Sequence, residues 1–325
     1  MLSRARNNTD RLASQKGASP NTVAGYRDSL RLLLRLASQR TRKKPSDLDI
    51  ADLDAPLVAA FLEHLEQDRH NSVRTRNNRL AAIHSLFSYA ALRHPEHAAS
   101  VQRVLAIPAK RHQRNLVTSL TDAELTALLA ACDTRTWTGR RDHAMLVLAA
   151  QTGLRVSELT GLTTADAALG TGPHVHCVGK GRKERRTPLL APTGAVLRNW
   201  ITERQGAAAD PLFPATTGKR LSRDAVERRV AHYVAKASIS CPSLRPKHVT
   251  AHTLRHTAAM QLLEAGNDIT VIALWLGHEQ VTTANIYIHA DMNHKERAIA
   301  RVQPPSTKPG RYRPADNLLA FLEAL

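Results

Sequence analysis

The spacing of apolar residues restricts this chain to a mainly helical fold. In three stretches between residues 20 and 90, apolar side chains recur every three or four positions, which is the period of an α-helix. The three stripes are Val23, Tyr26, Leu30, Leu33 and Leu34, then Val58, Phe61, Leu62 and Leu65, and then Leu80, Ile83, Leu86 and Phe87. Ser19 and Asp54 are N-cap candidates for the first two helices.

The second half of the chain is also mainly helical, but it contains one β-like segment. Thr121 and Glu124 form a candidate capping box at the start of a helix. The segment HVHCVGKGRKERRTPLL has β-like runs at 175–178 and 186–189 around a Gly-Lys-Gly-Arg-Lys turn, which predicts a small hairpin or meander. From residue 222 to about 263 the pattern predicts helix again.

Breaks in these patterns divide the chain into two expected domains. We expect a flexible N-terminus at 1–17, a helical domain at 18–106, a basic linker at 107–118, a second domain at 119–303 and a tail at 304–325. The tail ends in an amphipathic segment whose apolar face would suit a groove on a partner subunit or on its own domain. That face consists of Leu318, Leu319, Phe321, Leu322 and Leu325.

The charge of the chain indicates a polyanionic partner. The sequence has 46 Lys and Arg residues against 28 Asp and Glu residues, a net charge of +18. Nucleic acid is the commonest polyanion for so basic a protein, although a solvated basic surface is the plainer alternative. Both expected domains carry an excess of positive charge, so a basic tail alone does not account for it.

The cysteines and the absence of long apolar runs indicate a protein of the reducing cytosol. Cys132, Cys177 and Cys241 are odd in number and far apart, which argues against a disulfide scaffold or a zinc ribbon. No apolar run reaches the ~18 residues that span a bilayer, and the N-terminus does not read as a signal peptide. We expect a location in the bacterial cytosol or nucleoid and no contact with a membrane.

Four short motifs contain residues that could carry chemistry. They are TGLRVSEL with Arg155 and Glu158, VGKGRKERR with Lys180, AHTLRHT with His252 and Arg255, and LGHEQVTTANIYIH with His278 and Tyr287. Each has a plainer interpretation: a surface ion pair, a turn lysine, or a core tyrosine. His252 and His256 have a spacing that can bind zinc, but the metalloprotease pattern needs Glu where Thr253 stands.

Taken together, the motifs fit attack on a phosphodiester. Arginines bind phosphate oxygens as planar forks, and histidines can move protons near neutral pH. A tyrosine hydroxyl is a poor nucleophile unless positive groups stabilise its anion. The sequence has no carboxylate cluster that would bind magnesium, so we expect a reaction without metal or cofactor.

These motifs, in this order, resemble the tyrosine recombinase/integrase family, which includes phage integrases, Cre and the Xer recombinases. The resemblance extends from about Ser19 to His294 and is most specific in the C-terminal half. It implies a mainly α fold, with an N-terminal SAM-like core-binding domain and a mixed α/β catalytic domain that has a small antiparallel β-sheet.

The resemblance also implies roles for single residues. Tyr287 would attack the scissile phosphate and form a 3′-phosphotyrosyl link, and Arg155 and Arg255 would bind the phosphate oxygens. Lys180 would protonate the leaving 5′-oxygen, and His252 would assist proton transfer at the tyrosine. His278 would hydrogen-bond the phosphate, and Glu158 would support Arg155. No catalytic position departs from the family's pattern.

The expected partner is double-stranded DNA at a specific recombination site, bound by a homotetramer that the tail helps to assemble. DNA contacts are expected from one basic helix end and from the β-like segment, although a solvated arginine face is an equal alternative for the helix. The candidates are Arg74, Arg76, Asn77 and Arg79, with Lys183 and Arg185.

The biological role stays open at this point. A recombinase of a mobile element is favoured over one that resolves chromosome or plasmid dimers. A catalytically silent DNA-binding protein and a metal-dependent nuclease are further alternatives. The complete motifs argue against the first of these, and the missing carboxylates argue against the second.

Overall fold

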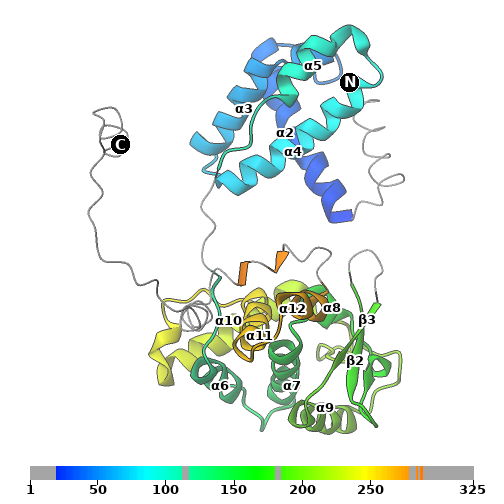
Figure 1. Cartoon of the computed structure of the whole chain (residues 1–325), viewed down its shortest axis with the longest axis vertical. Coiled ribbons are helices and arrows are strands. Elements are labelled where there is room, and N and C mark those ends of the chain that lie inside the picture. The colour runs from blue at the N-terminus through cyan, green and yellow to red at the C-terminus, as the bar shows by residue number, and fades with distance from the viewer. Residues whose placement is uncertain (1–19, 112–116, 180–183, 278–282, 285, 288–325) are drawn as a thin grey trace, which may run out of the picture. The chain divides into compact units, whose positions relative to one another are not determined.

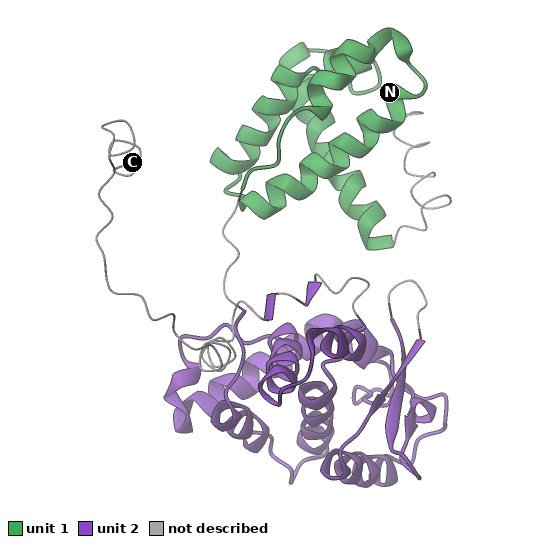
Figure 2. Cartoon of the chain, viewed as in Figure 1, with its two compact units in different colours: residues 1–115 green, residues 116–325 purple. Residues whose placement is uncertain are grey.

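The chain forms two compact units, residues 1–115 and 116–325 (Figure 2). The computed structural model describes residues 20–111, 117–179, 184–277, 283–284 and 286–287. Most of these residues are helical, and one small sheet lies in the second unit (Figure 1).

The first unit is built from helices alone in its described part. Its elements are α2 (Pro20–Thr41), η1 (Ile50–Asp52), α3 (Ala55–Gln67), α4 (Val73–Ala91), η2 (Pro95–His97) and α5 (Ala98–Leu105). The predicted stripes supply much of its core, in which Leu33, Phe61 and Phe87 are almost fully buried. Asp54 caps α3 by accepting a hydrogen bond from the Leu57 backbone at 2.9 Å, as its sequence position predicts.

The second unit packs helices around a three-stranded antiparallel sheet in the order β1-β2-β3. Its elements are α6 (Asp122–Ala130), α7 (Trp137–Thr152), α8 (Val156–Gly161), η3 (Thr164–Asp166), β1 (Ala167–Ala168), β2 (His174–Val178), β3 (Glu184–Pro188), α9 (Ala191–Arg204), α10 (Arg223–Ser240), η5 (Pro242–Leu244), α11 (Ala251–Glu264) and α12 (Ile269–Leu276). The predicted hairpin is β2 and β3, with Cys177 opposite Arg185, and the short β1 beside it was not predicted.

One predicted helix is divided in two. The expectation of continuous helix from 222 to about 263 was wrong, because α10 ends at Ser240 and α11 begins at Ala251. Pro242 and Pro246 explain the break, since proline lacks the backbone N–H of a helix interior and its ring clashes with the preceding turn. The break allows Thr250 to cap α11, the helix that carries His252 and Arg255.

Two glycines in left-handed conformation end the helices that surround the candidate site. Gly153 has φ 62° at the end of α7, and Gly277 has φ 64° at the end of α12. A Cβ at Gly153 would lie 2.6 Å from a Leu276 methyl group, and one at Gly277 would lie 2.8 Å from the Arg185 guanidinium. Only glycine satisfies both the conformation and the space.

No helix in the described part of the chain is long and apolar enough to cross a membrane.

The two units have separate hydrophobic cores. The first has one core, in residues 33–104, and the second has two clusters of buried residues. The smaller cluster of the second unit includes Leu276 and Tyr287.

Candidate active site

Arg155, Glu158 and Arg185 form a charged cluster where α8 meets β3. The Arg155 guanidinium donates to Glu158 Oε1 at 2.9 Å, and its backbone N–H donates to Oε2 at 2.8 Å. Arg185 donates to both oxygens of the same carboxylate, at 3.0 and 2.8 Å. Arg155 also donates to the Gly277 carbonyl at 3.1 Å. Glu158 therefore joins two arginines from elements that are distant in the sequence.

Glu158 is ionised at neutral pH. Burial acts to raise the pKa of Glu158, but hydrogen bonds from Arg185 and Arg155 outweigh it and hold the pKa below its usual range. The pairing with Glu158 likewise raises the pKa of Arg185, although burial opposes this. The cluster of two cations and one anion keeps one net positive charge.

Arg255 lies on α11 and is 2% exposed. Its guanidinium donates to the Gly153 carbonyl at 2.6 Å and to the Leu276 carbonyl at 2.7 Å. Burial, followed by repulsion from Arg155, lowers the pKa of Arg255 to about 10. Arg255 is thus a cation fixed by the ends of α7 and α12, which brings both glycine-ended helices to one place.

Tyr287 is buried beside these arginines, with 1% of its surface exposed. Burial raises the pKa of the Tyr287 hydroxyl, while the charges of Arg255 and Arg155 act to lower it. The phenol is therefore neutral at pH 7, and the positive charges that would stabilise its anion are already near. A phosphate group that replaced the backbone carbonyls bound to Arg155 and Arg255 would lie close to both arginines and to Tyr287.

His256 also lies at this site, although its motif predicts no catalytic role for it. Its Nδ1 lies 3.1 Å from the Tyr287 hydroxyl oxygen, and its ring centroid lies 4.3 Å from that of His252. One signal of this position is present in the sequence, because His256 follows Arg255 directly and stands four residues after His252 on the same helix. From the motifs, only the zinc-type spacing with His252 pointed to His256. In the described part of the chain, no three His, Cys, Asp or Glu side chains are arranged to hold a metal ion.

The structure thus brings together Arg155, Glu158, Arg255 and Tyr287, and it places His252 beside His256. Lys180, Lys183 and His278 lie outside the described residues, so their predicted roles stay predictions. Arg185, expected as a DNA contact, is bound to Glu158.

The predicted DNA-binding residues of α4 differ in their surroundings. Arg74 is exposed, and Arg79 is half-buried with a pKa lowered by burial and by Arg69. Arg76 is buried and donates to the Pro108 carbonyl at 3.1 Å. These contacts leave Arg74 as the α4 candidate most open to a phosphate.

Asn77 fixes the chain that leaves the first unit. Its side-chain amide donates to the Lys110 carbonyl at 2.8 Å, and its Oδ1 accepts from the Lys110 backbone at 3.1 Å. Lys110 in turn donates from Nζ to Glu66 at 2.7 Å. Asn77 therefore has a structural task, whether or not it also contacts DNA.

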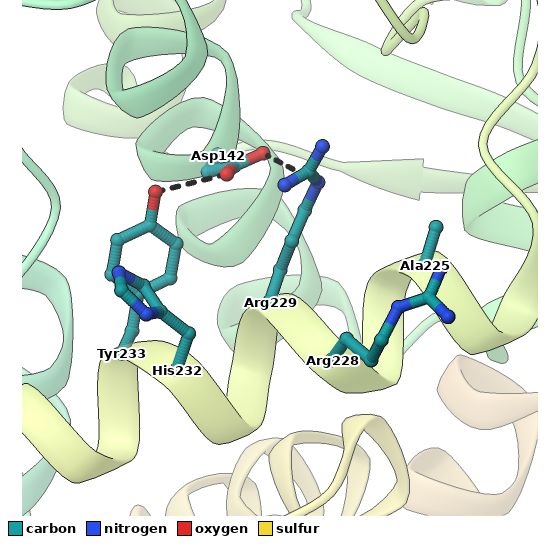
Figure 3. A pocket seen from close by; sticks show the side chains of 6 residues that line it. All are labelled: Asp142, Ala225, Arg228, Arg229, His232 and Tyr233. Carbon is teal, nitrogen blue, oxygen red and sulfur yellow. Dashed lines mark hydrogen bonds and ion pairs between the residues drawn. The ribbon is translucent and has the colours of Figure 1, made fainter.

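A second polar cluster lies between α7 and α10. Figure 3 shows the Asp142 carboxylate between the Tyr233 hydroxyl, at 2.9 Å, and the Arg229 guanidinium, at 3.5 Å. Arg141 donates twice to Asp142 and once to the Pro214 carbonyl, and both Arg141 and Asp142 are completely buried. Because the Asp142 carboxylate already has protein hydrogen-bond and ion-pair partners, we infer that this cluster stabilises the fold.

Comparison with protein families matches both units. Residues 118–294 match the family model described as phage integrase family, and residues 9–94 match the phage integrase N-terminal SAM-like domain. The chain belongs to the phage integrase family. This confirms the resemblance inferred from the motifs and the fold class inferred with it.

Relatives in this family are named integrases and recombinases. The chain is 55% identical over 315 residues to the putative integrase/recombinase y4rC of Sinorhizobium fredii, covering 97% of this chain and 95% of the relative. It is 33% identical to the tyrosine recombinase XerD of Vibrio cholerae, covering 86% and 89%. This phage integrase family member is accordingly a tyrosine-type site-specific DNA recombinase, as its motifs predicted.

Solved structures confirm the fold of the family member. The XerH recombinase bound to palindromic difH substrate superposes with a TM-score of 0.68 at 24% identity, covering 88% of this chain and 81% of that chain. The Tn1549 transposon integrase in complex with transposon right end DNA gives 0.70 at 19% identity, covering 92% and 99%. Both carry the same fold.

Proposed function

We propose that Tyr287 is the nucleophile with which this recombinase cuts and rejoins DNA at a specific site. One observation carries the proposal: Tyr287 is buried next to a histidine, with two arginines acting on the ionisation of its hydroxyl. A core tyrosine has no need of this set of neighbours. A nucleophilic tyrosine does, because its anion and the phosphoryl transition state both require positive charge.

The step conserves the phosphodiester bond. The Tyr287 oxygen attacks phosphorus, a bond from that oxygen to phosphorus forms, and the bond to the 5′-oxygen breaks. The phenol proton passes to a histidine of the His252–His256 pair, and Lys180 supplies a proton to the leaving 5′-oxygen. Arg155 and Arg255 hold the charge on the non-bridging oxygens. A 5′-hydroxyl from the partner duplex reverses the step, so ATP and metal are unnecessary.

The proposed setting is a homotetramer on double-stranded DNA in the bacterial cytosol, serving a mobile element. Support comes from the net charge of +18, from the integrase name of a 55% identical relative, and from the transposon integrase with the same fold. The second candidate is dimer resolution, which the XerD relative favours. The DNA site would separate these two roles, since the first recognises element ends and the second a chromosomal or plasmid site.

The test is covalent trapping on a nicked substrate that contains the bound site, selected first from genomic fragments. With EDTA present, we expect a protein–DNA adduct from the parent protein and none from Tyr287→Phe. Tyr26→Phe is the matched control, because Tyr26 lies in the first unit and should leave the adduct unchanged. No adduct on a confirmed site would favour a silent DNA-binding protein, and cleavage that EDTA abolishes would favour a metal-dependent nuclease.

A further inference from the structure

The carboxylate of Glu158 is divided between two arginines of unequal exposure. The Arg155 side chain is 34% exposed, the Arg185 side chain is 13% exposed, and the Glu158 side chain is 3% exposed. Arg185 makes the bidentate contact, whereas only one guanidinium nitrogen of Arg155 bonds to the carboxylate. Arg185, the more buried arginine, therefore makes the fuller contact with the Glu158 carboxylate. Arg155, the more exposed one, keeps guanidinium N–H groups that can bind a ligand.

We propose that Arg185 is a positioning residue that occupies Glu158, so that the cluster keeps a net positive charge and Arg155 keeps its outward donors for the scissile phosphate. The proposal rests on the proposed function of Arg155 as a phosphate ligand. Arg185 acts through Glu158 here, in place of the direct DNA contact expected from its sequence position.

Charge and geometry both support this assignment. Without Arg185, one anion would face Arg155 alone, and the net positive charge of the cluster would fall to zero. The carboxylate could then accept both guanidinium nitrogens of Arg155 and turn that side chain inward. Lysine would not replace Arg185 fully, because an ammonium group cannot donate two parallel bonds to one carboxylate.

Arg185 also borders the second support of Arg155. A Cβ at Gly277 would meet the Arg185 guanidinium at 2.8 Å, and the Gly277 carbonyl accepts from Arg155 at 3.1 Å. The side chain of Arg185 thus bonds to Glu158 and lies beside Gly277, the two residues that orient Arg155. Since Arg185 lies on β3 and pairs with Cys177 on β2, the same contact ties the hairpin to α8.

The first test compares Arg185→Met with Arg186→Met, its exposed neighbour on β3. Trapping is measured on a normal phosphodiester and on a methylphosphonate, which lacks the negative charge that Arg155 must neutralise. We expect Arg185→Met to lose on the order of 10- to 100-fold on the phosphodiester, by analogy with the partners that orient metal-binding side chains. The loss should be much smaller on the methylphosphonate, and Arg186→Met should cleave both normally.

Equal losses on the two substrates would overturn the proposal, because a distorted fold does not distinguish them. Normal cleavage of both by Arg185→Met would overturn it as well. A third overturning result is weaker DNA binding by Arg185→Met with a reduced salt dependence, which would show a direct phosphate contact. Arg185→Lys should fall between Met and the parent protein.

The second test uses Glu158→Gln alone and combined with Arg185→Met. If the unpaired carboxylate is what disables Arg155, removing its charge should recover part of the phosphodiester cleavage lost in Arg185→Met. A double variant that cleaves less than Arg185→Met would contradict this. The Tyr287→Phe adduct assay tests the proposed function separately. An adduct that persists in Tyr287→Phe would contradict the assignment of Tyr287 as nucleophile. Equal losses on the two substrates in Arg185→Met would contradict only this inference.

Discussion

The surroundings of Tyr287, the proposed nucleophile, act on its hydroxyl in opposite directions. The hydroxyl is kept protonated by burial, yet Arg255 and Arg155 act on it in the opposite direction. His256 is within hydrogen-bond distance of the hydroxyl. In the proposed reaction, phosphate binding and proton removal from Tyr287 would be coupled, because a phosphate bound to the arginines would change the electrostatic field at the tyrosine.

Substitution of His256 should slow the attack by Tyr287. Loss of a full general base costs about 10²–10⁴-fold, and we expect His256→Ala to lose less, about 10-fold, because His252 can take over the proton. The single-turnover rate of adduct formation measures this. His232→Ala is the control, since His232 lies on α10 in the second polar cluster. Equal rates for parent and His256→Ala would show that the hydrogen bond has no part in the reaction.

The rate of adduct formation should fall as pH rises through about 10. Arg255 loses its proton there because its pKa is lowered to about 10, whereas the pKa of Tyr287 is raised, so no compensating tyrosinate forms first.

The free energy of unfolding should follow the opposite trend. The folded state binds the Arg255 proton less well than the unfolded chain does, so the contribution of Arg255 to stability rises with pH above 10. Adduct rates and circular dichroism from pH 7 to 10.5 check both, and a rate that still climbs at pH 10.5 would contradict the assignment.

At the scale of elements, the second unit depends on a polar contact between two helices. Asp142 on α7 accepts from Tyr233 on α10 and balances the buried charge of Arg141. Burial raises the pKa of Tyr233, followed by the effect of Asp142, so the phenol remains a hydrogen-bond donor. Both α7 and α10 pack against α11, the helix that carries Arg255 and the His252–His256 pair.

Asp142→Ala should destabilise the second unit by about 3–5 kcal/mol, because it leaves the Arg141 guanidinium buried without a counter-charge. Tyr233→Phe should cost about 1.5–3 kcal/mol, the value of a hydrogen bond to a charged group. Denaturant unfolding measures both. Arg228→Met, on the exposed side of the same helix, should stay within about 0.5 kcal/mol of the parent. An Asp142→Ala protein as stable as the parent would exclude the counter-charge role.

The elements were largely predictable from sequence, and the contacts between them were not. Helical periodicity and capping residues predicted α3, α4 and α6 because these signals are local. The division between α10 and α11 was missed although its two prolines were visible. The Glu158–Arg185 pair spans 27 positions, and the His256–Tyr287 pair spans 31. No spacing rule reaches that far, since tertiary packing alone sets such distances.

At the scale of the molecule, the chain has two units with separate cores. The residues proposed for catalysis all belong to residues 116–325, whereas residues 1–115 carry an excess of positive charge. We propose that the first unit contributes DNA binding to a reaction carried out by the second. The excess positive charge in both units fits this division, because each would meet phosphate.

Deletion of residues 304–325 tests the proposed assembly. We expect the shortened protein to bind a single site nearly as well as the parent but to form fewer paired-site complexes, because its apolar tail would no longer reach a neighbouring subunit. Gel mobility on one-site and two-site DNA measures the two effects. A matched control replaces Asp316 and Asn317 with alanine, leaving the apolar face intact. Unchanged recombination after the deletion would show that the tail does not join subunits.

The anchoring of Lys110 by Asn77 has a consequence for affinity. On the other side of the unit boundary, the Leu120 backbone donates to Thr257 at 2.9 Å, so both ends of the connection are tied to folded elements. Residues 111–119 join the two anchors. If both units bind DNA, so short a connection would give the second unit an effective concentration on the order of millimolar once the first is bound. We therefore expect the intact chain to dissociate from its site more slowly than either unit alone, because a unit that dissociates would rebind while the other is still bound.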